Sequence, residues 1–232
     1  MLAHRIIPTI LMKRRLLVKG EGFAADRVVG NALQAAKIHA MRGVDEILML
    51  DVTASLEDRE PDYEMIKQLT QTARVPVTVG GGITKLRDVK NLLDSGADKV
   101  CVGYWKTLLI SAIARRYGEQ CVSATLDIRN EPRVGRMAQV LEEYGAGEII
   151  IQSIPRDGTM EGYDLNSIAI VASSVGVPVV ASGGCSGYSD MYSAIVAGAS
   201  GVAAGALFQF TDATPQGAAQ YLHEAGLEVR YA

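Results

Sequence analysis

Short apolar runs alternate with longer amphipathic segments along the whole chain. The apolar runs are rich in Val and Ile and end in or near Gly, Ser or Asp, which is typical of buried parallel strands. They occupy residues 5–12, 46–52, 75–79, 99–103, 121–128, 148–153, 177–182 and 201–205. Helical periodicity is found at residues 28–41, 63–73, 86–95, 107–117, 135–144, 165–174, 188–197 and 215–224. The pattern therefore predicts eight consecutive strand–helix units.

The chain also repeats itself. Residues 102 positions apart match without a gap in the middle of the chain, so that Gly81 and Gly82 recur as Gly183 and Gly184. Further matched positions are Gly43 with Gly145, Glu46 with Glu148, Asp88 with Asp190 and Gly103 with Gly205. The first strand of each copy matches at a distance of 116, from Thr9 to Thr125, because a longer loop follows it in the first copy. The chain is therefore two copies of one half.

Eight strand–helix units in a chain of this length fit a closed (βα)8 barrel. We predict an α/β protein with a single domain over residues 1–232, a TIM barrel built from two duplicated half-barrels at approximately 1–118 and 119–232. An open, doubly wound sheet is the alternative. A twofold repeat of four units closes more naturally into a ring, which favours the barrel.

Composition narrows the classes of function. The 232 residues carry a net charge of −3, so no basic field is present to bind nucleic acid. No apolar run approaches the ~18 residues of a membrane span, and the first residues lack the pattern of a signal peptide, so we expect a cytoplasmic protein. Cys101, Cys121 and Cys185 are widely spaced. We therefore expect neither a disulfide framework nor a metal site, and the sequence indicates no cofactor.

In such a barrel, chemistry takes place in the loops after the strand ends, and glycines gather there. A single glycine is as well explained by a tight turn as by ligand binding. Two symmetric glycine pairs that each precede a helix are more specific, because backbone N–H groups at helix N-termini bind anions. We interpret six glycines as phosphate-binding, namely Gly81, Gly82, Gly103, Gly183, Gly184 and Gly205. A ligand with a phosphate at each end is the resulting expectation.

Several motifs resemble the cyclase subunit of imidazole glycerol phosphate synthase, the HisF family. They are Arg5-Ile6-Ile7-Pro8, Val18-Lys19-Gly20, Asp51-Val52-Thr53-Ala54-Ser55, Arg156-Asp157-Gly158-Thr159 and Ala181-Ser182-Gly183-Gly184. The similarity runs nearly end to end. It implies a bisphosphate substrate and a docked glutaminase subunit (HisH-like). In the family, ammonia from the glutaminase travels along the barrel axis and attacks the ribulosyl substrate, which yields imidazole glycerol phosphate.

The family's chemistry requires two carboxylates that face each other at the ends of the first and fifth strands. A cyclisation by general acid–base catalysis needs one group to take a proton and another to give it. Asp127 matches the carboxylate of strand five, whereas Leu11 replaces that of strand one. Asp157 and Lys19 also match the family. The resemblance thus implies catalytic roles for Asp127, Asp157 and Lys19, with one member of the carboxylate pair missing.

Other positions depart from the family in the same direction. Gly103 and Tyr104 replace a polar pair after strand four, and Gly205 with Ala206 lacks a hydroxyl after strand eight. Residues 128–135 form a shorter segment than in the family. The aromatic side chains of Tyr104 and Trp105 could form a partner surface or a lid, but burial by packing is the favoured expectation. Two acids of the long first loop are candidates to replace the missing carboxylate, namely Glu21 and Asp26.

The opposite end of the barrel keeps the family's pattern. Arg5, Glu46, Lys99 and Glu148 stand at or before the starts of strands one, two, four and six, so charges of both signs meet at the N-terminal mouth. One interpretation is a ring of ion pairs that plugs the barrel floor. The resemblance implies that these four residues are the gate for ammonia. It also implies that Asp98 faces the glutaminase.

Three functional hypotheses remain. The leading one is a HisF-like barrel that docks a glutaminase and conducts ammonia without full cyclase activity. Leu11 and residues 59–63 resemble second-copy members found with surface-polysaccharide genes, which implies ammonia delivery to a separate N-acetyl sugar amidotransferase. The second is a genuine cyclase, a lyase of histidine biosynthesis, that relies on Asp127 and Asp157. The third is a non-catalytic scaffold that activates its glutaminase.

Overall fold

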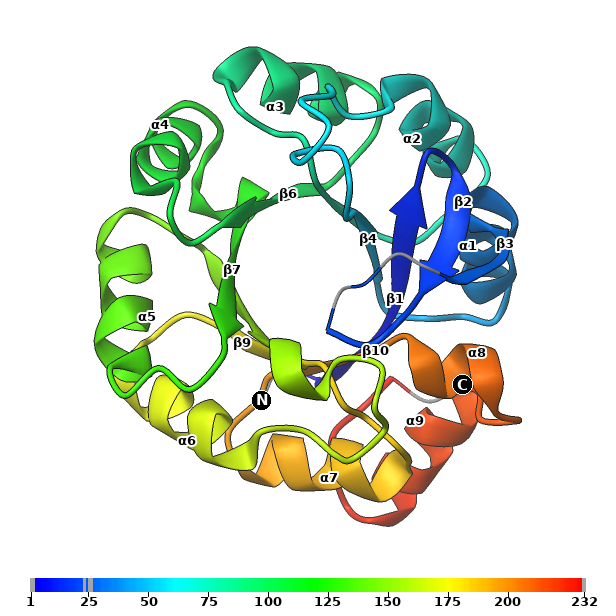
Figure 1. Ribbon diagram of the computed structural model, residues 1–232. Coiled ribbons are helices and arrows are strands. Elements are labelled where there is room, and N and C mark those ends of the chain that lie inside the picture. The colour runs from blue at the N-terminus through cyan, green and yellow to red at the C-terminus, as the bar shows by residue number, and fades with distance from the viewer. Residues whose placement is uncertain (1–2, 23, 25–26, 231–232) are drawn as a thin grey trace.

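Eight parallel strands form a closed ring in the computed structural model, which describes residues 3–22, 24 and 27–230 (Figure 1). The ring consists of β1 (Arg5–Lys13), β4 (Ile47–Asp51), β5 (Val77–Gly80), β6 (Lys99–Gly103), β7 (Val122–Ile128), β8 (Glu148–Ser153), β9 (Val179–Ser182) and β10 (Gly201–Ala204). It closes because β10 pairs in parallel with β1, from Arg5 opposite Gly201 to Pro8 opposite Ala204. The predicted (βα)8 TIM barrel is confirmed.

Helices surround the ring (Figure 1). They are α1 (Ala32–Met41), α2 (Tyr63–Thr70), α3 (Leu86–Asp94), α4 (Thr107–Tyr117), α5 (Val134–Glu143), α6 (Leu165–Ser174), α7 (Tyr188–Val196), α8 (Ala206–Phe210) and α9 (Pro215–Glu224), with the short turns η1 (Glu119–Cys121) and η2 (Ile154–Arg156). All but the short α8, η1 and η2 fall within the predicted amphipathic segments or one residue outside them, because apolar positions at helical spacing pack on the strands. In the described part of the chain, no helix is long and apolar enough to cross a membrane.

The first loop differs from the prediction. It contains two further strands, β2 (Leu16–Lys19) and β3 (Arg27–Asn31), which extend β1 as an antiparallel ribbon. Arg14 and Arg15 form the turn with φ values of 47° and 71°, a left-handed conformation suited to a tight reversal. Residue 28 was predicted to begin a helix, but β3 takes residues 27–31. The helix therefore begins at Ala32, where the Asn31 side chain accepts a hydrogen bond from the N–H of Gln34 at 3.0 Å.

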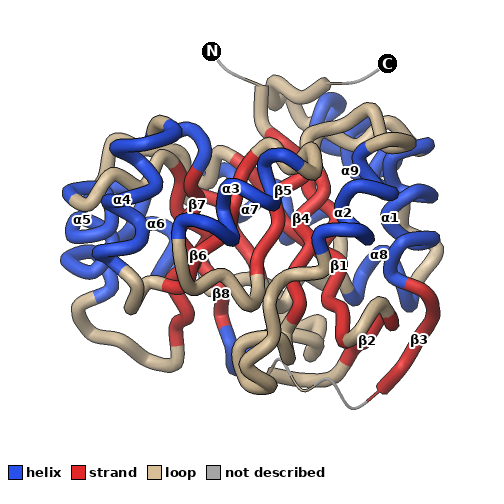
Figure 2. The backbone as a smooth tube through the Cα atoms, turned by 90° about the horizontal axis from the view of Figure 1, so that it is seen from above, coloured by secondary structure: helices blue, strands red, loops and turns tan. Residues whose placement is uncertain are grey.

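Side chains of the ring strands pack on two sides. Ile6 and Ile10 of β1 belong to the large core between strands and helices, whereas Ile7 and Leu11 belong to a second cluster inside the barrel. The inner cluster consists of Ile7, Leu11, Val18, Leu48, Leu50, Cys101, Ile150, Val180 and Ala203. Figure 2 shows the two chain ends at one mouth of the barrel and β2 and β3 at the other. The strands begin at the first mouth, so we call it the N-terminal mouth and the other the C-terminal mouth.

Candidate functional site

Strand register arranges the inward side chains in layers, to which alternate strands contribute. From the N-terminal mouth upward, these layers contain Glu46, Lys99 and Glu148; then Ile7, Thr78, Ser123 and Val180; then Leu48, Cys101, Ile150 and Ala203; then Thr9, Thr125 and Ser182; then Leu50, Gly103 and Gln152; and finally Leu11 and Asp127. The middle of the barrel is apolar, and polar groups occupy both ends. Candidate chemistry is therefore divided between two mouths.

The four charged residues of the N-terminal mouth form one closed network. Arg5 lies 2.8 Å from Glu46 and 2.5 Å from Glu148. Lys99 lies 2.8 Å from Glu46 and 3.0 Å from Glu148. Each carboxylate thus contacts both cations, and the two positive and two negative charges balance. The sequence placed these residues at one mouth, and the structure brings all four into mutual contact.

Two hydroxyl groups complete the network from inside the barrel. Thr78 donates to Glu46 at 2.5 Å, and Ser123 donates to Glu148 at 2.7 Å. Burial by itself would raise the pKa of Glu148, but the charges of Lys99 and Arg5 and the Ser123 hydrogen bond outweigh burial and hold that pKa below its ordinary value. No motif of the sequence marked Ser123 or Thr78 as part of this site. Both residues stand near the start of a strand, on the face that points into the barrel. This position is the signal by which the sequence could have identified them.

Outside this network the molecular surface is hollowed. A cavity of about 560 Å³ is lined by Arg5, Glu46, Lys99 and Glu148 together with residues such as Asp98 and Arg230. Asp98 is exposed at its edge, and one of its carboxylate oxygens accepts a hydrogen bond from the N–H of Val77 at 2.8 Å. The hollow opens toward solvent on the side away from the apolar interior.

At the C-terminal mouth, Leu11 and Asp127 lie in the same layer on opposite sides of the ring, because four pairing steps separate β1 from β7 in either direction. Leu11 is 2% exposed and belongs to the inner apolar cluster. The Asp127 carboxylate accepts no hydrogen bond from the described residues. Burial raises its pKa to about 6, with a partial offset from the charge of Arg129. The carboxylate therefore faces an apolar side chain across the barrel.

Two described acids of the first half, Asp51 and Glu21, do not supply a free carboxylate beside Leu11. Asp51, at the end of the neighbouring strand β4, accepts hydrogen bonds from the N–H groups of Thr53 and Ala54 and from Arg59, whose guanidinium lies 3.1 Å away. Glu21 is exposed to solvent. The other candidate of the first loop, Asp26, lies outside the described residues.

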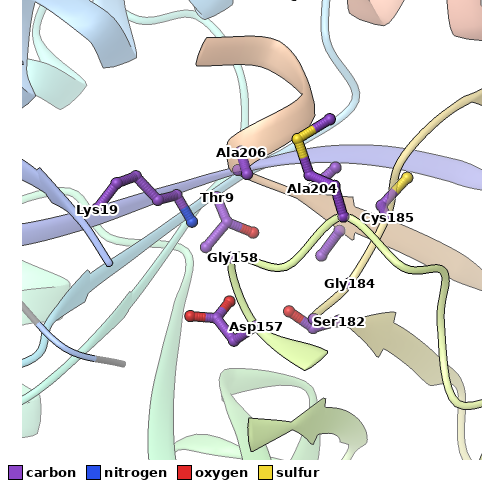
Figure 3. Close-up of a pocket in the computed structure, with 13 residues that line it drawn as sticks. Thr9, Lys19, Asp157, Gly158, Ser182, Gly184, Cys185, Ala204 and Ala206 are labelled. Atoms are coloured by element: carbon purple, nitrogen blue, oxygen red, sulfur yellow. The ribbon is translucent and has the colours of Figure 1, made fainter. Parts of the chain in front are cut away.

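Lys19 and Asp157 lie close together at the C-terminal mouth, on the side that the second half of the chain forms. They line a small cavity of about 20 Å³ together with Thr9, Ser182 and the glycines of that half (Figure 3). Burial lowers the pKa of Lys19, which is 3% exposed, while the nearby Asp157 carboxylate opposes this shift. A Cβ at Gly205 would lie 2.6 Å from the Lys19 ammonium nitrogen, so glycine leaves the space that the ammonium group occupies.

The symmetric glycine pairs have a structural reason of their own. Added Cβ atoms at Gly81 and Gly183 would lie 2.2 and 2.6 Å from the carbonyl oxygens of Asp51 and Ser153, and both glycines have positive φ. Close backbone packing therefore requires glycine at these positions in both halves. Gly183, Gly184 and Gly205 also line the cavity beside Lys19.

Gly103 has a different neighbour. A Cβ on Gly103 would lie 2.5 Å from the Trp105 ring, so the indole covers the inward side of that residue at the C-terminal mouth. The expectation that Trp105 is buried was wrong, because its side chain is 60% exposed. It rests edge-on against half-buried Tyr104, with ring centroids 5.2 Å apart. An aromatic side chain thus lies against Gly103, whereas the matching glycine of the second half, Gly205, lies against the Lys19 ammonium group.

Comparisons with known proteins find both a matching family and similar individual proteins. Residues 5–214 match the family described as histidine biosynthesis protein. The chain is also 36% identical, over 250 aligned positions, to the imidazole glycerol phosphate synthase subunit HisF of Chlorobium phaeovibrioides. That alignment covers 99% of this chain and 100% of the relative. The 250 aligned positions outnumber the 232 residues of this chain, so the relative has residues without a counterpart here.

Proposed function

The chain belongs to the histidine biosynthesis protein family, and from this premise we propose that it is a HisF-like barrel that docks a glutaminase at its N-terminal mouth and conducts ammonia to its C-terminal mouth. In this proposal the cyclase reaction itself is strongly reduced. The observation that carries the proposal is the contrast between the two mouths: the charged network of Arg5, Glu46, Lys99 and Glu148 is complete, whereas Leu11 faces Asp127.

The barrel interior suits neutral ammonia. Above the charged network, the inner cluster contributes the apolar side chains of Ile7, Leu48, Ile150 and Val180. A low-dielectric interior disfavours the charged form of an amine, so ammonium would lose its proton before entry. The balanced network at the mouth offers hydrogen-bonding groups at the entrance without a net charge. Conduction requires nothing further from the acids of the C-terminal mouth.

The C-terminal mouth supports the second part of the proposal. Loss of one positioned general acid or base typically reduces a rate by about 10²–10⁴. Asp127 alone cannot take and give protons at two facing positions, and Asp51 is held by Arg59. Trp105 covers Gly103, where one end of a bisphosphate would have to bind. Lys19 and the glycines of the second half remain for a single anionic group.

The proposed partners follow from this division of roles. The hollow around Asp98 is the surface proposed for a HisH-like glutaminase. The family position and the lack of a facing carboxylate among the described residues favour a separate acceptor enzyme for the ammonia. We assign this role to an N-acetyl sugar amidotransferase, on the resemblance of Leu11 and residues 59–63 to that branch. A cytoplasmic location accompanies this assignment.

A genuine cyclase is the second candidate, and two observations favour it. The HisF relative matches over its whole length. In addition, Asp127 has a pKa of about 6, suited to proton transfer near neutral pH, and Lys19 lies close to Asp157. In this alternative, Asp127 and Asp157 would carry out the acid–base steps between them.

Turnover of the ribulosyl bisphosphate with ammonium chloride separates the two candidates. We expect the unmodified chain to turn over about 10²–10⁴ more slowly than the variant Leu11→Asp, which restores the facing carboxylate. Leu11→Asn is the matched control, because it introduces a polar side chain without an acid. Equal, rapid turnover of the unmodified chain and Leu11→Asp would establish the cyclase instead. Co-purification with a HisH-like glutaminase and stimulation of its activity test the partner, and no association would contradict the proposal.

A further inference from the structure

The loops that follow β1 and β7 occupy equivalent places in the two halves of the barrel. At the end of β1, Met12 lies opposite Asp51 of β4. At the end of β7, Ile128 lies opposite Ser153 of β8 in the same register. The members of these pairs are 116 and 102 positions apart along the chain, which are the two spacings of the repeat. Residues that follow the strands can therefore be compared position by position.

In the first half, two ion pairs fasten the turn after β1 to the loop after β4. Arg15 donates to both carboxylate oxygens of Asp62, at 2.5 and 2.8 Å. Arg14 lies 3.1 Å from the carboxylate of Glu57. A guanidinium that donates to two carboxylate oxygens fixes the geometry of a pair as well as its charge. The first half therefore supplies its own cations to the acids of this loop.

The second half keeps the acid of the two-oxygen pair but not its arginine. Asp164 is the counterpart of Asp62, and it caps α6 through the N–H of residue 167. The counterpart of Arg15 is Glu131, which is an acid. The residue before it, Asn130, has a φ of 110°, so it is left-handed like the matching arginine of the first half. A left-handed residue is thus retained at this turn, while the positive charge has become negative.

Glu131 and Asp164 line a hollow of about 610 Å³, which lies between the loop before α5 and the start of α6. These two helices are neighbours in the ring (Figure 1). Glu161 is a third acid of the hollow, and none of the three forms an ion pair with another described residue. Arg156 also lines the hollow, but it donates to the carbonyl oxygens of Glu161 and Gly162, both at 3.2 Å. Three carboxylates thus share the hollow with one guanidinium.

The donors that already contact these two carboxylates are neutral. Glu131 accepts a hydrogen bond from the backbone N–H of Arg129 at 2.7 Å. Asp164 accepts from the N–H and the hydroxyl of Ser167, at 3.1 and 2.7 Å. An ionised carboxylate has about four acceptor sites, so both acids can accept further hydrogen bonds from a cation. Since ligand sites typically enclose roughly 300–1,000 Å³, the hollow has both the charge and the room for a cationic group.

We propose that this hollow is the docking site for an arginine-bearing turn of the enzyme that accepts the ammonia. The inference rests on the proposed delivery of ammonia to a separate enzyme, and it places the contact with that enzyme. The hollow follows the ends of β7 and β8, so it lies at the C-terminal mouth, where ammonia leaves. The first half shows how such a turn fits, with a guanidinium on the aspartate that caps the next helix. A partner guanidinium between Glu131 and Asp164 repeats that arrangement.

A cyclic peptide tests the site without the acceptor enzyme. It has the sequence of residues 12–17, the turn that fills the equivalent place in the first half. In nuclear magnetic resonance titrations, the side-chain amides of Asn130 and Asn166, which line the hollow, should shift with half-saturation at or below about 1 mM. The exposed amide of Gln71 should not shift. Citrulline is uncharged, so in place of the arginine that corresponds to Arg15 it should weaken binding at least about fivefold.

Variants of Glu131 complete the test. Glu131→Arg supplies the missing guanidinium from the chain itself, and we expect at least about tenfold weaker peptide binding, because the new arginine occupies Asp164 and repels the peptide. Glu131→Gln removes one charge only and should weaken binding about threefold. Asp212→Arg makes the same change of charge at an exposed acid outside the hollow, and it should leave the affinity within about twofold.

Three results would overturn the docking site: no saturable shift, binding that neither citrulline nor Glu131→Arg weakens, or equally tight binding of free arginine amide, which would indicate a site for a small molecule. With the acceptor amidotransferase and the complex of barrel and glutaminase, Glu131→Arg should raise the acceptor concentration for half-maximal amidation at least about fivefold. Glutaminase association should stay unchanged in this variant. Failure of the unmodified chain to associate with a glutaminase would instead contradict the proposed function, so the two failures are distinguishable.

Discussion

At the scale of single residues, Leu11 and Asp127 make opposite contributions in equivalent positions. Leu11 buries apolar surface in the inner cluster, whereas the Asp127 carboxylate loses hydration without receiving a hydrogen bond from the described residues. Its pKa rises from 3.8 to about 6. The ionised form is thus less stable in the folded chain than in the unfolded one. A group kept at such a disadvantage is typical of a functional site.

Replacement of Asp127 by Asn should stabilise the protein in a pH-dependent way. Because the folded pKa lies above the unfolded value, the penalty is absent below about pH 4, grows between pH 4 and 6, and is complete above it. Each pKa unit corresponds to about 1.4 kcal/mol, so we expect Asp127→Asn to raise the free energy of unfolding by about 3 kcal/mol at neutral pH. Urea unfolding across this pH range measures the difference.

A matched control is the exposed acid Asp212, whose replacement by Asn should change the free energy of unfolding by less than about 0.5 kcal/mol at every pH. A difference for Asp127→Asn that is the same at acid and neutral pH would contradict the burial argument.

At the scale of elements, the duplicated halves use the same device to begin their helices. Asp62 accepts a hydrogen bond from the N–H of Met65 at the start of α2, and Asp164, 102 positions later, accepts one from Ser167 at the start of α6. Only the first-half aspartate also pairs with an arginine, Arg15 of the β1–β2 turn, at 2.5 and 2.8 Å. The cap thus fastens the first-loop ribbon to α2.

Substitution of the two aspartates separates the cap from the ion pair. Loss of an N-cap typically destabilises by about 1 kcal/mol, so we expect both Asp62→Ala and Asp164→Ala to lower the free energy of unfolding by about that amount. Asp62→Asn keeps a capping oxygen and loses the ion pair. Since Arg15 is half exposed, we expect this variant to lose less than about 0.5 kcal/mol. Chemical denaturation of the three variants measures these effects, and a larger loss for Asp62→Asn than for Asp62→Ala would refute the assignment.

At the scale of the whole molecule, the barrel is a tube with a charged floor, an apolar middle and a polar upper end. The floor is a single network, so each residue depends on the others. Removal of Lys99 would leave the two buried carboxylates with Arg5 as their one cation among the described residues, beside the hydroxyls of Thr78 and Ser123. Breaking a buried ion pair in this way typically destabilises by about 3–5 kcal/mol. The network therefore combines structural and proposed conducting roles.

Replacement of Lys99 by Met should alter ammonia delivery more than glutamine hydrolysis. In the complex with glutaminase, we expect hydrolysis within about twofold of normal and a change of at least about fivefold in the share of amide nitrogen-15 that reaches the acceptor product rather than the solvent. Lys90→Met, at an exposed lysine, is the control. An unchanged share would favour the scaffold hypothesis. Thermal unfolding of both variants establishes that the barrel remains folded.

Local pattern and internal repetition were enough to predict the barrel. The spacing of apolar residues along a strand or a helix reflects which side chains that element buries. This spacing can be recognised in the sequence without knowledge of the tertiary structure. The ribbon β2–β3 was not predicted, because its strands are held by pairing with β1 rather than by a face of their own. The burial of Trp105 was predicted wrongly for a similar reason. Its contact with Gly103 depends on the geometry of a turn, which the spacing of apolar residues does not indicate.

The sequence by itself determined the eight strand–helix units and their order, the duplication, and which charged residues gather at the N-terminal mouth. Strand starts in a parallel barrel must share one end, so Arg5, Glu46, Lys99 and Glu148 had to converge. Tertiary structure alone decided that hydroxyls of Thr78 and Ser123 complete their network, and that the Asp127 carboxylate faces Leu11 without a hydrogen bond from the described residues. Hydrogen bonding and desolvation depend on distances across the ring, which no linear pattern contains.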